Sequence, residues 1–186
     1  MTLPEALRAG LDRYVRALEA RFGLDLVSVV LFGSWARGEG RAESDIDLLV
    51  IIRGLSGGRF ERDRPVRDLA KEVSEELADR VSPIVSTPGG AEHVKPYYLG
   101  MLSGHMMLHD AGGFSAAVLE GLQRRLRDLV YLYWFDRGLP LGVAIQRAKA
   151  AALAADPGLK PVVEGWNLLG DPALVGPLTR APSGRQ

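Results

Sequence analysis

Two short apolar runs, separated by a polar and glycine-containing segment, constrain the fold of this chain more than any other feature. The runs are VSVVLF at Val27–Phe32 and LLVII at Leu48–Ile52. Short apolar runs that are rich in β-branched residues and bounded by glycine or polar residues are typical of buried strands. We therefore expect a pair of buried strands, around which the remaining segments fold.

A pair of aspartates, Asp45 and Asp47, stands at the start of the second run. Residues i and i+2 of a strand project to the same face, so the two carboxylates should lie side by side. Their mutual repulsion raises the free energy of ionising both, and a hard cation removes this penalty. Mg²⁺ is usually held by one or two carboxylates together with phosphate oxygens and waters. The pattern therefore predicts a Mg²⁺ site at Asp45 and Asp47.

A Gly-Ser pair, Gly33-Ser34, follows the first run and predicts a phosphate-binding turn. Glycine lets a phosphate approach the backbone closely. Ser34 suits the N-cap of a short helix that extends to Gly38, and free N–H groups at a helix start bind anions. Arg37 lies in the same turn and Arg41 follows, and each of the two arginines fits either a phosphate contact or plain surface. These features predict a triphosphate, gripped near the two aspartates.

The combined motif, Gly-Ser followed ten residues later by Asp-x-Asp within apolar runs, resembles the signature of the DNA polymerase β-like nucleotidyltransferase superfamily. The segment FGSWARGEGRAESDIDLLV resembles the minimal nucleotidyltransferase (MNT) type of this superfamily. The resemblance implies an α+β fold in which helices flank a small mixed sheet, followed by a C-terminal helical extension. It also implies a Mg²⁺-dependent transfer of a nucleoside monophosphate, with AMP from ATP as the first expectation, to an acceptor hydroxyl with release of pyrophosphate.

Roles for individual residues follow from the same resemblance. It makes Asp45 and Asp47 the catalytic metal ligands, and Gly33, Ser34 and Arg37 the nucleotide-binding residues. The acceptor is left open between a protein hydroxyl, an RNA end and a small molecule.

The chain departs from the superfamily pattern on the third predicted strand, Val81–Ser86. Many members carry a third carboxylate there, and the matching residue here is Ser82. Asp79 is close in sequence but is expected on the preceding helix. The departure leaves a second interpretation open, in which the chain is a catalytically weakened antitoxin or a nucleotide- or partner-binding module. Its partner would be a helical toxin of the HEPN type.

Helical patterns surround the predicted strands. Apolar residues at helical spacing predict a first helix that starts at Thr2, has Pro4 in its first turn and ends at Gly23. A loop over Arg53–Arg64 and a second helix over Pro65–Arg80 are expected next, with Pro83 placing the third strand at a sheet edge. Two later helices are predicted over Phe114–Arg137 and Leu141–Ala155.

The domain organisation follows from these elements. We expect a nucleotidyltransferase domain over residues 1–110, a helical extension over 111–175 and a mobile tail over 176–186. The alanine-rich helix over Leu141–Ala155 favours close packing, either on a neighbouring helix or on a second copy of the chain in a homodimer. His105 and His109 are four residues apart, but no third ligand is evident, so we do not expect a zinc site.

Composition narrows the remaining classes of function. The formal net charge is zero, from 23 basic and 23 acidic residues. This balance argues against bulk electrostatic attraction to nucleic acid or to an anionic membrane. The chain has no cysteine, which excludes disulfides and thiolate metal sites. Without a signal-peptide core or an apolar run of about 20 residues, a cytoplasmic protein with no membrane contact is expected.

Overall fold

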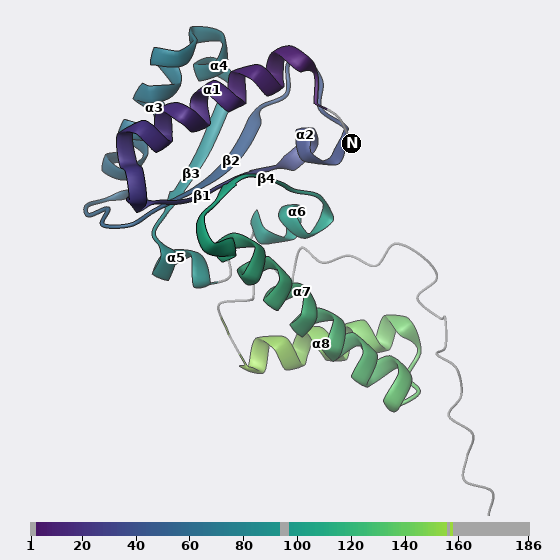
Figure 1. Ribbon diagram of the computed structural model, residues 1–186. Coiled ribbons are helices and arrows are strands. Elements are labelled where there is room, and N and C mark those ends of the chain that lie inside the picture. Colours follow the sequence, from purple (N-terminus) through teal and green to yellow (C-terminus); the bar gives the residue numbers. More distant parts are fainter. Residues whose placement is uncertain (1–2, 94–96, 156, 158–186) are drawn as a thin grey trace, which may run out of the picture. The chain divides into compact units, whose positions relative to one another are not determined.

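The computed structural model describes residues 3–93, 97–155 and 157 of the chain (Figure 1). It contains two compact units. The first consists of residues 1–93 and 100–119, and the second consists of residues 94–99 and 120–186. The predicted extension beyond residue 157 and the predicted tail over 176–186 lie outside the described residues.

A four-stranded mixed sheet forms the centre of the first unit (Figure 1). The strand order is β3-β2-β1-β4. β1 pairs antiparallel with both β2 and β4, whereas β2 pairs parallel with β3. This confirms the predicted α+β class with a small mixed sheet. The strands are β1 (Leu26–Phe32), β2 (Ile46–Ile52), β3 (Val81–Ser86) and β4 (Met106–Asp110).

The two central strands are those predicted from the apolar runs. Every residue of β1 is buried, and only Asp47 of β2 is not fully so. A strand that is buried on both faces has apolar residues at consecutive positions, whereas a strand that is buried on one face alternates apolar and polar residues. β3 has the predicted bounds and lies at a sheet edge, where the missing N–H of Pro83 is tolerated.

One face of the sheet is covered by α1 (Glu5–Phe22), α3 (Arg59–Val73) and α4 (Glu75–Arg80) (Figure 1). The Tyr14 hydroxyl on α1 donates a 2.7 Å hydrogen bond to the Val66 carbonyl on α3, and burial raises the pKa of this phenol well above its usual range. The main core lies between these helices and the sheet, and it includes Leu11, Leu18, Leu31, Ile46, Leu48, Val50 and Leu77.

The first helix begins later than predicted, at Glu5, with Pro4 as its N-cap. Its C-cap is Gly23, as expected, with the positive φ of 53° that favours glycine. The predicted loop over Arg53–Arg64 is wrong in its second half, because α3 already starts at Arg59. The Glu61 carboxylate accepts a 2.8 Å hydrogen bond from the Gly58 N–H, and this capping contact stabilises the earlier start.

The predicted helix over Pro65–Arg80 is interrupted at Ser74. This residue has extended backbone, with φ −174°, and its hydroxyl accepts a hydrogen bond from the Leu77 N–H. Ser74 thereby acts as the N-cap of α4. On the other face of the sheet, a short helix α5 (Pro88–Glu92) follows β3, with Thr87 as its N-cap.

The segment after residue 96 also forms helices. α6 (Tyr97–Ser103) precedes β4, and α7 (Phe114–Tyr131) begins in the first unit and continues in the second. The predicted helix over Phe114–Arg137 changes to a π-helical turn at Leu132–Asp136. α8 (Leu141–Ala155) has the predicted bounds. Its buried residues within the second unit are small or aliphatic: Ala144, Ile145, Ala148 and Ala152.

Within the described ranges, no helix combines the length and the apolar character that crossing a membrane requires.

Candidate functional site

The two aspartates of the motif lie where β2 begins. Asp45 directly precedes the strand and is exposed, whereas Asp47 is its second residue and is half-buried. Ile46 and Leu48 point into the core beneath α1 and α3. Because side chains alternate along a strand, Asp47 projects from the opposite face of the sheet. Asp45, two residues earlier, projects toward the same face as Asp47.

Gly33 brings the Gly-Ser pair against these carboxylates. It follows directly after Phe32, which pairs in register with Asp47 across β1 and β2. Its φ is 73°, in the left-handed region, and a Cβ at this position would overlap the Asp47 Oδ2. Both the conformation and the space therefore require glycine. The two halves of the sequence motif, ten residues apart, meet at this contact.

The surroundings of Asp47 disfavour its negative charge. Burial raises the pKa of this carboxyl, the nearby charge of Asp45 raises it further, and Arg37 acts in the opposite direction. A carboxylate with a raised pKa is one whose ionised form lacks sufficient compensation. The described part of the chain contains no cluster of three or more His, Cys, Asp or Glu side chains with metal-site geometry. The donor set at this point is thus two carboxylates.

Arg37 ends the short helix α2 (Gly33–Arg37), close enough to Asp47 to influence its ionisation. Its Nε lies 2.8 Å from the Glu39 Oε2, so its side chain is engaged in a local ion pair. Ser34 does not act as the predicted N-cap. The N-cap position falls on Phe32, and the helix already includes Gly33, whose positive φ turns the chain directly into it. The Ser34 carbonyl accepts a 2.9 Å hydrogen bond from the Glu39 N–H.

Ser82 on β3 is the direct neighbour of Asp47, because the parallel register pairs these two residues. It therefore occupies the position at which the superfamily pattern expects a third carboxylate. Asp79 lies on α4, as predicted, and its side chain is exposed. Neither residue adds a carboxylate beside Asp47.

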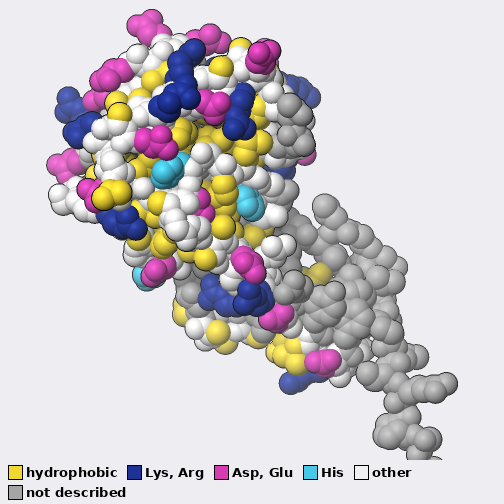
Figure 2. All heavy atoms as spheres, in the orientation of Figure 1, with side chains coloured by type: hydrophobic (Ala, Val, Ile, Leu, Met, Phe, Trp, Pro, Cys, Tyr) yellow, Lys and Arg dark blue, Asp and Glu magenta, His cyan; other side chains and the backbone are white. Residues whose placement is uncertain are grey.

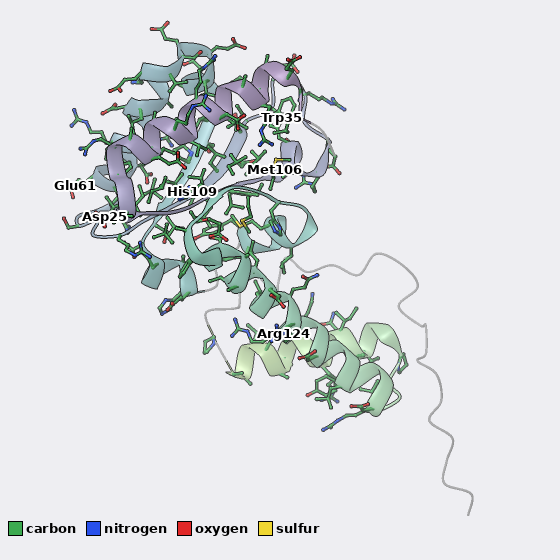
Figure 3. All side chains as sticks on the ribbon, viewed as in Figure 1. Asp25, Trp35, Glu61, Met106, His109 and Arg124 are labelled. Carbon is green, nitrogen blue, oxygen red and sulfur yellow. The ribbon has the colours of Figure 1, made fainter. Side chains whose placement is uncertain are left out.

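A contact that the sequence did not reveal holds the segment before Asp45. The Ser44 carbonyl accepts hydrogen bonds from Trp35 Nε1 at 3.3 Å and from Arg80 Nη2 at 3.4 Å. The Arg80 guanidinium also lies over the Trp35 ring, 5.4 Å from its centroid. Trp35 belongs to α2 and lies near α1 (Figure 3). Arg80 is 36 residues from Ser44, and no local pattern predicts such a contact.

His105 and His109 have separate hydrogen-bond partners. His109 lies on β4 and its Nδ1 is 2.9 Å from the Glu19 Oε1 at the end of α1 (Figure 3). His105 precedes that strand, and its Nδ1 hydrogen-bonds the Met101 carbonyl at 2.7 Å.

Comparison with known proteins identifies a matching family model and a sequence relative. A family model described as a nucleotidyltransferase domain matches residues 11–93. A protein of Methanocaldococcus jannaschii, described as a candidate protein adenylyltransferase, is 34% identical over 115 residues. The alignment covers 61% of this chain and 78% of that protein.

Two solved structures resemble the fold more distantly. One is a toxin-antitoxin complex with AMP-PNP, at a TM-score of 0.42 and 16% identity, covering 63% of this chain and 90% of that one. The other is a tri-AMPylated HEPN toxin of Shewanella oneidensis in complex with an MNT antitoxin. It has a TM-score of 0.40 and 14% identity, and it covers 65% and 90% of the two chains.

Proposed function

The chain belongs to the nucleotidyltransferase family, and from this premise we propose that it transfers AMP from ATP to a protein hydroxyl with release of pyrophosphate. Family membership confirms the resemblance that the Gly-Ser and Asp-x-Asp motif carries. One observation supports the proposed site above all others: the backbone of Gly33 packs directly against the Asp47 carboxylate. A phosphate held at the Gly-Ser turn would therefore lie next to the aspartate pair.

Asp45 and Asp47 would hold Mg²⁺ in this proposal. Two oxygen donors of like charge suit a hard cation that takes its other ligands from waters and phosphate oxygens. The raised pKa of Asp47 supports this fit, because burial and the charge of Asp45 disfavour its ionised form, Arg37 compensates this only in part, and a cation would provide further compensation. When bound, the ion neutralises charge on the α-phosphoryl group and on the leaving pyrophosphate.

The remaining site residues would hold the triphosphate and orient it. Gly33 holds the turn against the Asp47 carboxylate, and Ser34 would offer a hydroxyl to a phosphate bound there. Arg37 would exchange its ion pair with Glu39 for a phosphate, to which a guanidinium can donate two hydrogen bonds.

In the proposed transfer, the acceptor hydroxyl oxygen bonds to the α-phosphorus while the bond from this phosphorus to the pyrophosphate oxygen breaks. Pyrophosphate leaves with the electron pair, and the hydroxyl proton passes to water. Positioning and electrostatic stabilisation supply most of the acceleration in such transfers.

The nature of the acceptor rests on the sequence relative. The Methanocaldococcus jannaschii protein is described as acting on a protein, which favours a Tyr, Ser or Thr hydroxyl over an RNA end or a small molecule. The resemblance to MNT proteins makes a HEPN-type protein the first partner to test.

A second candidate function is favoured by Ser82. With a hydroxyl in place of a carboxylate opposite Asp47, the chain would bind a nucleotide and a partner protein without turnover. In this case it would act as an antitoxin by masking its partner.

The experiment that tests the proposal follows ATP labelled on its α-phosphate, incubated with Mg²⁺, the full chain and an extract of the host. We expect label on a protein band, reduced about 10²–10³-fold or more in Asp45→Asn/Asp47→Asn. Asp79→Asn is the matched control, since it removes an exposed carboxylate outside the site. Equal labelling by the wild type and the double variant would contradict the assignment. Nucleotide binding without labelling would favour the second function.

A further inference from the structure

A cavity of about 550 Å³ opens in the first unit between the start of α1, residues 40–42 and α4. This volume lies within the range of small-molecule sites, which is roughly 300–1,000 Å³. Its walls include apolar side chains, among them Leu7 of α1, Leu77 of α4 and the ring of Trp35. Three arginines, Arg13, Arg41 and Arg80, also line it.

The lining of this cavity carries a positive excess. Glu76 is the carboxylate among the lining residues, against three guanidinium groups. In the described part of the chain, Arg13, Arg41 and Arg80 make no ion pair with a carboxylate. Figure 2 shows basic, acidic and hydrophobic side chains interspersed on the visible face of the first unit. Guanidinium groups match phosphate geometry, and unpaired ones in one cavity favour an anionic ligand.

Arg80 supplies the most specific observation. Its Nη2 donates to the Ser44 carbonyl, and its guanidinium lies over the Trp35 ring. These contacts fix the plane of the group, yet its Nε is buried and has no acceptor among the described residues. A buried donor without a partner has lost its hydrogen bond to water and gained none in the protein, which is unfavourable. An anionic oxygen in the cavity would supply the missing acceptor.

The cavity is distinct from the aspartate pair. Ile46 and Trp35 line it and belong to the core beneath the helices, whereas Asp47 projects from the opposite face of the sheet. We propose that this cavity binds a small organic phosphate, with its phosphate on Arg80 and Arg41 and its apolar part against the aliphatic wall. This proposal does not depend on the function proposed above.

The test uses Trp35 as a reporter in the full chain. The chain has three tryptophans, so Trp134→Phe together with Trp166→Phe leaves Trp35 as the single emitter. Phenyl phosphate is titrated in the presence of EDTA, which prevents Mg²⁺-dependent binding elsewhere. We expect a saturable change in Trp35 fluorescence, and calorimetry on the wild type should give the same affinity.

Variants locate the bound phosphate. We expect Arg80→Gln and Arg41→Gln each to weaken binding about tenfold or more, the loss of one charge-assisted contact. Arg16→Gln is the matched control, because Arg16 is an exposed arginine on α1 that does not line the cavity, and this variant should bind phenyl phosphate as the wild type does. Asp45→Asn/Asp47→Asn should leave the affinity unchanged. Should Arg80→Gln fail to fold, Arg41→Gln decides, because Arg41 is exposed and its loss removes no buried contact.

Two results would overturn the proposal. One is the absence of saturable binding at phenyl phosphate concentrations up to about 10 mM. The other is binding that is lost in the aspartate double variant and unaffected by Arg41→Gln, since the anion would then occupy the nucleotide site.

Discussion

At the scale of single residues, the partial burial of Asp47 conflicts with the ionisation of its carboxyl in the absence of a cation. Its backbone belongs to a buried central strand, and its carboxyl is packed against Gly33 and near the charge of Asp45. Burial and like charge both raise its pKa. The ionised residue therefore destabilises the free protein, which is the usual condition of a site that has been shaped for a ligand rather than for stability.

This conflict predicts a pH-dependent gain in stability for Asp47→Asn. Because the folded-state pKa is raised, the charge costs stability at every pH above the folded pKa. The cost fades as the pH falls, and it is absent below the unfolded-state pKa, where both states are protonated. In EDTA, urea unfolding should thus show the variant to be more stable at neutral pH and equal to wild type in strong acid. Asp79→Asn should show no such difference, and a less stable Asp47→Asn at neutral pH would contradict the account.

Gly33 makes a second prediction at this scale. Gly33→Ala forces a side chain into the left-handed region and into the space of the Asp47 carboxylate. We expect a loss of stability of about 1–3 kcal/mol and a loss of nucleotide binding, because the carboxylate must move. Gly54→Ala is a suitable control, since its φ of 69° carries the same strain while no atom lies within 4 Å of the added Cβ. Equal nucleotide binding by the two alanine variants would show that the space at Gly33 is not needed.

At the scale of elements, the parallel pairing of β2 and β3 sets Ser82 beside Asp47. Ser82→Asp would place a third carboxylate where the superfamily pattern has one. In metal-free buffer we expect this variant to be less stable than wild type, because a third negative charge adds to the repulsion at Asp47. Mg²⁺ should restore its thermal stability more than it does for wild type. Thermal unfolding with and without Mg²⁺ measures this, and an identical Mg²⁺ response in both proteins would contradict the placement.

β1 and β2 were predicted to within two residues because burial on both faces leaves continuous apolar runs in the sequence, and β3 was predicted with its observed bounds. β4, whose residues are all partly exposed, was not predicted. The helices were predicted less well. The start of α3 depends on the contact of Glu61 with the Gly58 N–H, and the break before α4 depends on the hydroxyl of Ser74. Each is a single side-chain hydrogen bond that competes with the helical pattern around it. The Arg80 contact with Ser44 joins distant segments, and the sequence carries no local signal for it.

At the scale of the whole molecule, Gly33 and Asp47 of the sequence motif lie against each other in the fold. The site residues come from a single stretch, so their proximity follows from one β-α-loop-β unit rather than from the assembly of the two compact units. Because the formal net charge is zero, a charged ligand or partner would be recognised by local charged side chains rather than by the overall charge of the protein. The motif therefore predicted which residues meet, whereas the cavity beneath α1 required the folded structure.

The central claim is that Asp45 and Asp47 together bind a Mg²⁺–nucleotide complex, and one calorimetric titration tests it most directly. A non-hydrolysable ATP analogue is titrated into wild type, Asp45→Asn/Asp47→Asn and Asp79→Asn, each with Mg²⁺ and with EDTA. The account predicts binding that requires Mg²⁺, is unchanged in Asp79→Asn and is weakened at least about 100-fold, roughly 2.7 kcal/mol, in the double variant. Binding of equal affinity in the double variant, or in EDTA, would contradict it.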